Sequence, residues 1–273
     1  MSSEINDALY SDIVIDKNDI LPKLDLIRSQ ILLPSIELFK KSIFNITNLL
    51  VLPVRISSYS YLRYAILQNL AKAGPEVDKK AFISSYVRKY YDQEGKRKIA
   101  ENSIPYLSSL MPVDPELAQS IQVLLYSAVL NTWSSFERLS DNIWSILASQ
   151  SQYTPKNPTK KYRFSSIMQI DISYSRINLE STIKTVTNAP NLLLLEKTRH
   201  LIAHQQGIMD EKFKNELNSL PLPINSLVNT PNGDTVLITM DLERQFIETV
   251  LEAAYDLVTA IDDILTPKGV KEI

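Results

Sequence analysis

The sequence contains no cysteine. This absence excludes a disulfide framework, a thiolate nucleophile and a zinc site built from cysteine ligands. Glycine is also scarce, with five residues in a chain of 273. Folds rich in strands and tight turns usually need more glycine, because its backbone accepts conformations that other residues avoid. The scarcity of glycine therefore favours a helical protein.

The chain also lacks a strong excess of charge and a long apolar run. Its formal net charge is −2 at pH 7, whereas proteins that bind long nucleic acids by bulk electrostatics are usually basic. Any contact with RNA would therefore need a local basic patch. No segment reaches the about 18 apolar residues of a membrane span, and the acidic first residues do not look like a secretory signal. We expect a cytoplasmic protein with no membrane contact.

The residues that are present suit a helical protein with a core. Hydrophobic residues make up 44% of the chain and charged residues 22%, as in ordinary globular proteins. We expect an all-α fold, with an N-terminal helical region over residues 1–111 and a helical domain over residues 112–273. In the first region, prolines should break the helices at Pro22, Pro34 and Pro53, since proline removes a helical hydrogen bond.

Two long helices are expected to frame the C-terminal domain. The first should begin after Asp114, a favoured N-cap residue, and run to about residue 149. The second should begin at Asp241 and stop before Pro267. Each carries an apolar stripe at helical spacing, which is typical of a helix that faces a core. The stripes contain Val129, Trp133, Phe136, Ile143 and Leu147 in the first helix, and Phe246, Val250, Leu257, Ile261 and Ile264 in the second.

Shorter elements are expected between these two helices. Residues 175–188 predict a short helix, and Asn188 or Asn191 could begin the next one, which should stop at Gly207. The turn signal at residues 232–234, followed by β-branched residues, predicts one short β-hairpin. The whole pattern indicates an antiparallel helical bundle with one hairpin and extra N-terminal helices.

Both histidines of the chain lie in one expected helix, in the segment "TRHLIAHQQG". His200 and His204 are four residues apart, so they share one helix face, about 40° apart. Arg199 and His204 are five apart, about 140° around the helix. Within one copy this is an imperfect pair, which would improve if two copies of the helix met across a dimer axis. A histidine beside an arginine can hold a phosphate and move a proton.

These residues resemble the signature of the HEPN superfamily, which comprises helical nucleotide-binding domains. That signature is an arginine, a polar residue that is often asparagine, and a histidine after a short gap. It maps to Arg199, His200 and His204, and the helix "NTWSSFERLSDNIWSIL" and the trailing "GIMDEKF" are similar to bacterial HEPN-like proteins as well. The resemblance covers roughly residues 115–265. His200 occupies the slot where asparagine is commoner.

The resemblance implies a metal-independent endoribonuclease that acts as a homodimer, with the two motif helices facing each other across one RNA-cleaving cleft. Many members are toxins of toxin–antitoxin pairs or phage-defence effectors, so a cognate antitoxin or a defence partner protein is implied too. In that scheme His204 is the acid or base, Arg199 clamps the phosphate and His200 positions either one. A fixed guanidinium can stabilise the charge that gathers on the phosphoryl oxygens. Neither a metal nor another cofactor is expected.

Other polar residues are weaker candidates. Glu137 and Asp141 are four apart on the first long helix and could face the cleft, although such a pair is more often a solvated strip. A basic cluster could contact RNA phosphates, although a charge run is usually only a solvated face. This cluster contains Lys156, Lys160, Lys161 and Arg163.

Two alternatives to a ribonuclease stay open. His200 and His204 form an HxxxH pair that could bind a metal, with oxygens from Glu196 and Asp210. The zincin form of that motif needs a glutamate directly after the first histidine, where this chain has Leu201. The other alternative is a non-catalytic helical module that binds RNA or a protein partner, in which the polar residues only cap the helix or form hydrogen bonds.

Overall fold

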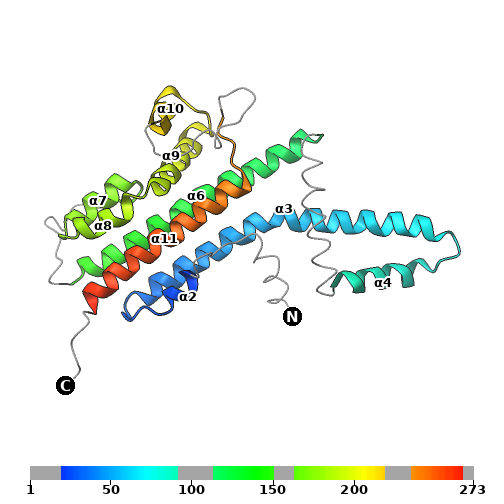
Figure 1. Cartoon of the computed structure of the whole chain (residues 1–273), viewed down its shortest axis with the longest axis horizontal. Helices are drawn as coiled ribbons and strands as arrows, with labels where there is room; N and C mark the ends of the chain where they lie inside the picture. The colour runs from blue at the N-terminus through cyan, green and yellow to red at the C-terminus, as the bar shows by residue number, and fades with distance from the viewer. Residues whose placement is uncertain (1–19, 92–112, 151–162, 219–234, 267–273) are drawn as a thin grey trace, which may run out of the picture. The chain divides into compact units, whose positions relative to one another are not determined.

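The computed structural model describes residues 20–91, 113–150, 163–218 and 235–266. Every element of regular secondary structure in these ranges is an α-helix (Figure 1), so the expectation of a predominantly helical chain is confirmed. None of the described helices is both long and apolar enough to cross a membrane.

The described residues form two compact units. One contains residues 47–91 and 113–124, and the other contains residues 20–46 together with the described residues from 125 onward. This division differs from the expected boundary at residue 112. Residues 20–46 belong to the same unit as the C-terminal helices, and the first turns of the helix that begins at Pro115 belong to the other unit. The reason is that two helices, α3 and α6, run through both units.

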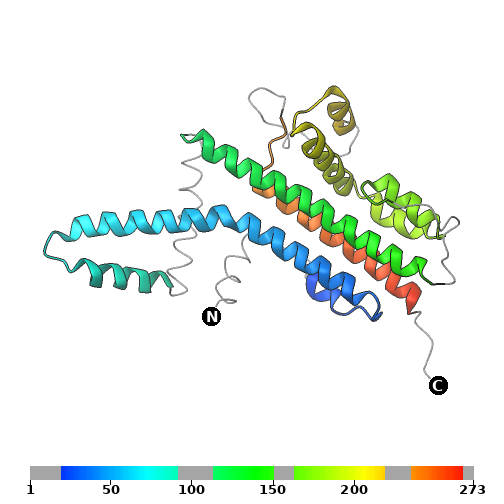
Figure 2. The same ribbon diagram turned by 180° about the vertical axis from the view of Figure 1, so that it is seen from behind.

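The larger unit is organised around its last helix, α11. Figures 1 and 2 show α6 and α11 side by side over much of their length, and α2, α8 and α9 also contact α11. The helices of this unit are α2 (Ile20–Leu24), the first part of α3 (Leu33–Ala73), the later part of α6 (Pro115–Ala148), α7 (Ile167–Ser175), α8 (Glu180–Thr187), α9 (Pro190–Gln205), α10 (Glu211–Asn218) and α11 (Met240–Leu265).

The expected apolar stripes form the core of this unit. All five residues named for the first long helix are buried, as are four of the five named for the second; Ile264 is half-buried. Trp133 and Phe136 also contact each other edge to face, with ring centroids 6.1 Å apart. Because burial of a large apolar side chain contributes about 1.5–3 kcal/mol, these two stripes supply much of the stabilisation of this unit.

Helix ends follow the expected chemistry in one case and depart from it in others. The Asp114 side chain accepts the backbone N–H of Leu117 at 3.0 Å, which confirms it as the cap of α6. At α11 the cap is Thr239, not Asp241, because the Thr239 hydroxyl accepts the N–H of Leu242. Asp241 lies instead in the first turn, where its negative charge is favoured by the helix dipole.

The expected proline breaks are only partly correct. Pro53 lies inside α3, so a break there is wrong; a long helix can lose one hydrogen bond and continue. Pro34 is the second residue of α3, a position whose N–H has no helical partner in any case. Pro22 lies inside the short helix α2.

Two further expectations on the shorter helices need correction. α9 begins at Pro190, and its N-cap is Ala189 rather than Asn188 or Asn191, because proline is already suited to the first helical position. The helix expected over residues 175–188 is shorter and corresponds to α8. A separate helix, α7, precedes it and was not predicted from the sequence. α10 was not expected either.

The expected β-hairpin is not seen as a pair of strands. Its turn at residues 232–234 lies outside the described residues. Within the described chain, Thr235 forms a single antiparallel bridge with Ile208, and the N–H of Val236 donates to the carbonyl of Gly207 at 2.8 Å. The β-branched segment therefore joins the end of α9 by one short contact.

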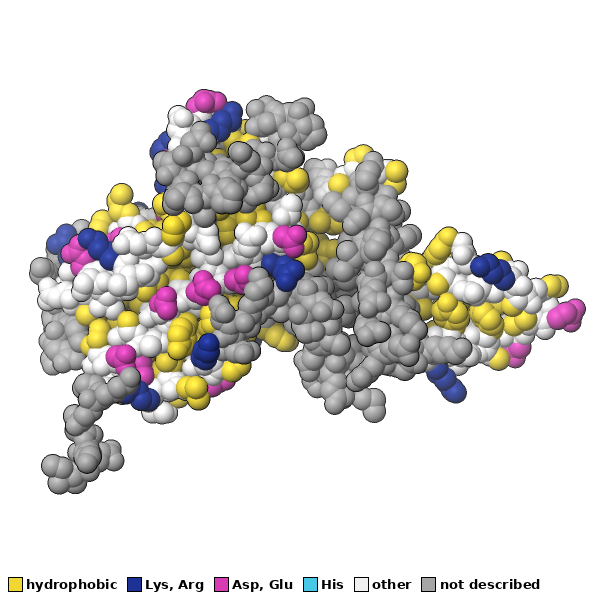
Figure 3. Space-filling model, viewed as in Figure 1, with side chains coloured by type: hydrophobic (Ala, Val, Ile, Leu, Met, Phe, Trp, Pro, Cys, Tyr) yellow, Lys and Arg dark blue, Asp and Glu magenta, His cyan; other side chains and the backbone are white. Residues whose placement is uncertain are grey.

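The smaller unit contains a helical hairpin made by the later part of α3 and by α4 (Lys79–Tyr91). The amide of Asn69 donates to the hydroxyl of Tyr86 at 3.2 Å and connects the two helices. Asp78 caps α4 through the N–H groups of Lys80 and Ala81. Hydrophobic side chains stay exposed on this hairpin, as Figure 3 shows. The exposed large hydrophobic residues of the two helices include Tyr64, Leu67 and Ile83.

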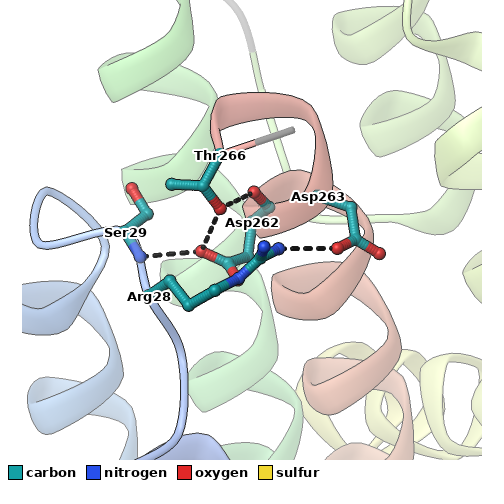
Figure 4. A network of polar contacts seen from close by, with 5 residues as sticks. All are labelled: Arg28, Ser29, Asp262, Asp263 and Thr266. Atoms are coloured by element: carbon teal, nitrogen blue, oxygen red, sulfur yellow. Dashed lines mark hydrogen bonds and ion pairs between the residues drawn. The ribbon is translucent and has the colours of Figure 1, made fainter. Parts of the chain in front are cut away.

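A polar network fixes the residues before α3 to the end of α11 (Figure 4). The buried carboxylate of Asp262 accepts the N–H of Ser29 at 2.7 Å and the Nε of Arg28 at 3.0 Å. Arg28 also binds the exposed Asp263 at 2.7 Å, and the Thr266 hydroxyl donates to the carbonyl of Asp262. Burial by itself would raise the pKa of Asp262, but the bonds from Ser29 and Arg28 outweigh it and leave the pKa lowered.

This network predicts an unequal effect of two neighbouring substitutions. Asp262→Ala should lower the free energy of unfolding by about 2 kcal/mol, because it leaves a buried N–H and a guanidinium without their acceptor. Asp263→Ala, the matched control, should change it by less than about 0.5 kcal/mol, as for most exposed pairs. Urea unfolding at pH 7 measures both. Because the pKa of Asp262 is lowered on folding, its contribution is present at pH 7 and should disappear as the pH falls through that lowered pKa. Equal effects of the two substitutions would contradict this account.

Candidate functional site

The helix α9 carries the arginine and both histidines. Its inner face is fixed by buried residues that include Leu195, Leu201 and Ile202. His200 and His204 lie on the exposed face, with ring centroids 4.6 Å apart and ring planes at 52°. The structure therefore brings the two imidazoles together on one accessible surface, as their spacing predicts.

Arg199 points to a different environment from the two histidines. It is half-buried, and its charge opposes the rise in pKa that burial causes in two carboxyl groups, Glu137 on α6 and Glu196 on α9. It also acts on the adjacent His200. Within the described residues, no hydrogen bond or ion pair joins Arg199 to His204. Arg199 therefore acts electrostatically on Glu137, Glu196 and His200.

Of the two carboxyl groups expected to support the site, Glu137 feels the charge of Arg199, and Asp141 does not. The pKa of Glu137 is raised, first by burial and then by Asp141, while Arg199 opposes the rise. Partial burial raises the pKa of Asp141, and a bond from Ser145 opposes this. Glu137 is half-buried, whereas Asp141 is exposed. Of the two, only Glu137 is acted on by a charge from α9. Raised carboxyl pKa values beside a cation are common in functional sites.

The basic residues expected to contact RNA are described only in part. Lys156, Lys160 and Lys161 lie outside the described residues, and Arg163 is exposed just before α7. The cations that the structure does place near the histidines are Lys197 and Lys212. These two were not singled out from the sequence, because Lys212 belongs to α10, a helix that the sequence did not predict.

His200 lies in a cationic environment. Its pKa is lowered by partial burial, then by His204, Arg199, Lys197 and Lys212. The two lysines share Glu216, at 3.1 Å from Lys197 and 3.9 Å from Lys212. Since its pKa lies below the ordinary value of about 6.5, His200 is mainly neutral at pH 7 and can accept a proton there.

The alternative of a metal site is not supported by the placement of its oxygen donors. Asp210 caps α10, accepting the N–H of Phe213 at 2.7 Å, and also accepts the amide of Gln205 at 2.9 Å. The backbone N–H of Ile167, at the start of α7, binds Glu196 and lowers its otherwise raised pKa. In the described part of the chain, no group of three or more histidine or acidic side chains could hold a metal ion.

The end of α9 is fixed by a close contact that the sequence did not reveal. After Gln206, in the left-handed conformation, Gly207 has a φ of +82°. A Cβ atom added there would lie 2.3 Å from the hydroxyl of Tyr126 on α6. That hydroxyl donates to the carbonyl of Val236 at 2.7 Å. The expected stop at Gly207 is correct, but the reason for glycine is tertiary as well as local.

Comparisons with known proteins gave no relative: no family model matches the chain, and no curated protein or solved structure matches it. The assignment of the site therefore depends on the geometry of α9 and on the sequence motif.

Two glycines offer a matched test of the contact at the end of α9. Gly207→Ala should destabilise the protein by about 3 kcal/mol, since it adds backbone strain of about 1–2 kcal/mol to overpacking of about 1–3 kcal/mol against Tyr126. Gly74 has a similar φ of +85° but open space around it. Gly74→Ala should therefore cost only the strain. Thermal unfolding followed by circular dichroism measures both, and equal losses would show that the Tyr126 contact is unimportant.

The environment of His200 predicts the direction of a pKa change. Removal of a neighbouring positive charge favours the imidazolium, so His204→Asn and Lys212→Gln should each raise the pKa of His200. NMR titration of the His200 ring protons measures this pKa. Lys214→Gln, on the same helix as Lys212, is the control, since Lys214 is not among the groups that act on His200. A pKa that does not rise with either substitution would refute the described cationic cluster.

Proposed function

We propose that this protein is a metal-independent endoribonuclease whose cleft forms where the α9 helices of two copies meet, and that it acts as a toxin or a phage-defence effector. The observation that carries the proposal is the placement of Arg199, His200 and His204 on one helix end. Both imidazoles are accessible and adjacent there, and the motif is similar to that of HEPN domains. A cognate antitoxin or defence protein is part of the proposal.

The local charges suit an RNA phosphate. Arg199, Lys197 and Lys212 all act on His200. One carboxylate, Glu216, is shared by the two lysines, so the group keeps a positive charge that attracts an anion bound beside this histidine. The chain as a whole has a net charge of −2, and binding would therefore depend on this local cluster rather than on overall charge.

The chemistry requires one proton acceptor and one phosphate clamp. A neutral imidazole takes the proton of the ribose 2′-hydroxyl, and that oxygen attacks the adjacent phosphorus. The bond from phosphorus to the 5′-oxygen then breaks, and this oxygen receives a proton, leaving a cyclic phosphate. His200, which is mainly neutral, can serve as the base and His204 as the acid, while Arg199 stabilises the charge on the phosphoryl oxygens.

The proposed dimer supplies what one copy lacks. Arg199 and His204 diverge along a single helix, so their joint action on one phosphate requires the histidine of one copy and the arginine of the other. Ile208, which follows the motif, is 54% exposed. An exposed apolar side chain four residues after His204 suits a surface that a second copy covers.

Purified protein incubated with single-stranded RNA in EDTA tests the proposal. We expect cleavage in EDTA, and a loss of about 100-fold or more in rate for Arg199→Ala and for His204→Ala, as for removal of an acid–base group or a charge stabiliser. Arg176→Ala, an exposed arginine at the end of α7, is the matched control and should cleave normally.

Three results of the cleavage assay, and one of a measurement of size, would contradict the proposal in different ways. Equal cleavage by every variant would indicate a contaminating nuclease. Activity that EDTA abolishes would indicate a metal-dependent enzyme. RNA binding without cleavage, lost in Arg199→Ala, would favour the non-catalytic module. Light scattering during gel filtration gives the oligomeric state in the same samples. A monomer that cleaves RNA would contradict the proposal that two copies form the cleft.

A further inference from the structure

A carboxyl group is buried at the start of α11. The side chain of Glu243 is fully buried, and its Oε1 accepts the hydroxyl of Thr132, on α6, at 2.7 Å. Its other oxygen, Oε2, is also buried and has no hydrogen-bond partner. A buried carboxylate with one free oxygen is costly, so the group is held in a place that suits only its neutral form.

The surroundings of Glu243 offer nothing to stabilise a negative charge apart from Thr132. Burial raises the pKa of Glu243 to about 8, and the bond from Thr132 opposes the rise. Among the described residues, no charged side chain of α2, α6, α8 or α9 acts on this group. On α11 itself, Asp241 and Arg244 pair with each other at 3.7 Å. Burial also raises the pKa of Tyr126 above its ordinary value of 10.0, so it does not titrate near pH 8.

The first turn of α11 is connected to the end of the motif helix. The N–H of Glu243 donates to the carbonyl of Thr239, the cap residue, at 3.0 Å. Three residues earlier, the N–H of Val236 donates to Gly207, and the Val236 carbonyl accepts the Tyr126 hydroxyl. Residues 236–243 are therefore one short stretch that is fixed at one end by Glu243 and at the other by the contact with Gly207.

We propose that Glu243 is a pH-operated latch: its neutral carboxyl keeps the first turn of α11 closed, and loss of its proton opens that turn and releases Val236 from Gly207 at the end of α9. A carboxylate needs water, and the nearest way to admit it is to unwind a terminal turn, because helix ends open at lower cost than helix centres. The latch concerns conformation and does not depend on the proposed ribonuclease activity.

The sign of the pH dependence follows from linkage. Glu243 has a raised pKa in the folded protein, so the folded state holds a proton that the unfolded state loses above about pH 4.5. Its contribution to stability is therefore complete below that pH and decreases as the pH rises, about tenfold in the folding equilibrium per pH unit, until the folded protein ionises near pH 8. The first turn of α11 should therefore begin to open near pH 8, where Glu243 ionises in the folded protein.

NMR of the full chain, labelled with ¹³C at the valine methyl groups, tests the latch between pH 6 and 9.5. The methyl signals of the buried Val236 should move toward random-coil positions with a midpoint near pH 8. Those of Val250, in the middle of α11, should not move. In Glu243→Gln, which preserves the shape of the side chain, Val236 should show no transition. Glu252→Gln, at an exposed position of the same helix, should behave as the wild type.

A second variant keeps the test decisive if Glu243→Gln does not fold. Thr132→Val removes the bond that lowers the pKa of Glu243, so the Val236 transition should move to higher pH. The proposal is overturned if Val236 stays unchanged up to pH 9.5 in the wild type. It is equally overturned if the same transition persists in Glu243→Gln, because another group would then be responsible.

Discussion

The larger unit depends on the burial of α11. This helix lies beside α6 and also contacts α2, α8 and α9, so most of its surface is removed from water. Burial on this scale stabilises the apolar residues of the helix, but it forces each polar residue to find a partner inside the protein or to stay neutral. The two ends of α11 meet this demand differently. Asp262 remains ionised because Arg28 and Ser29 bind it, whereas Glu243 has only the Thr132 hydroxyl and remains protonated at neutral pH.

The same packing positions the motif helix. Because its inner face is occupied by leucine side chains, α9 presents His200 and His204 to solvent, while the half-buried Arg199 acts on the carboxyl group of Glu137. Tyr126 holds the helix end close to α6, and only glycine leaves room for that approach. The candidate site is therefore a rigid helix end whose polar groups face outward. Such a surface can bind a ligand on one side only. A cleft with two sides forms only when another molecule packs against it.

Much of this architecture could be read from the sequence, for physical reasons that differ between elements. The stripes that contain Trp133 and Phe246 repeat at the helical period, and that period survives in any fold that buries one face. Asp114 caps α6 as expected because capping is local. The prediction of a break at Pro53 failed because the loss of one hydrogen bond is small against the many that a long helix retains. α10 was missed because its eight residues are mostly polar and contain only two apolar side chains, too few to establish a helical period by themselves.

The sequence by itself determined the helical class, the two long core helices and the pairing of the histidines on one face, since each follows from spacing along the chain. Only the tertiary structure decided that Arg199 acts on Glu137, that Lys212 adds to the charge around His200, and that Gly207 lies against Tyr126. Those relations join residues far apart in the sequence. They depend on which helix faces pack together, and local spacing carries no information about that choice.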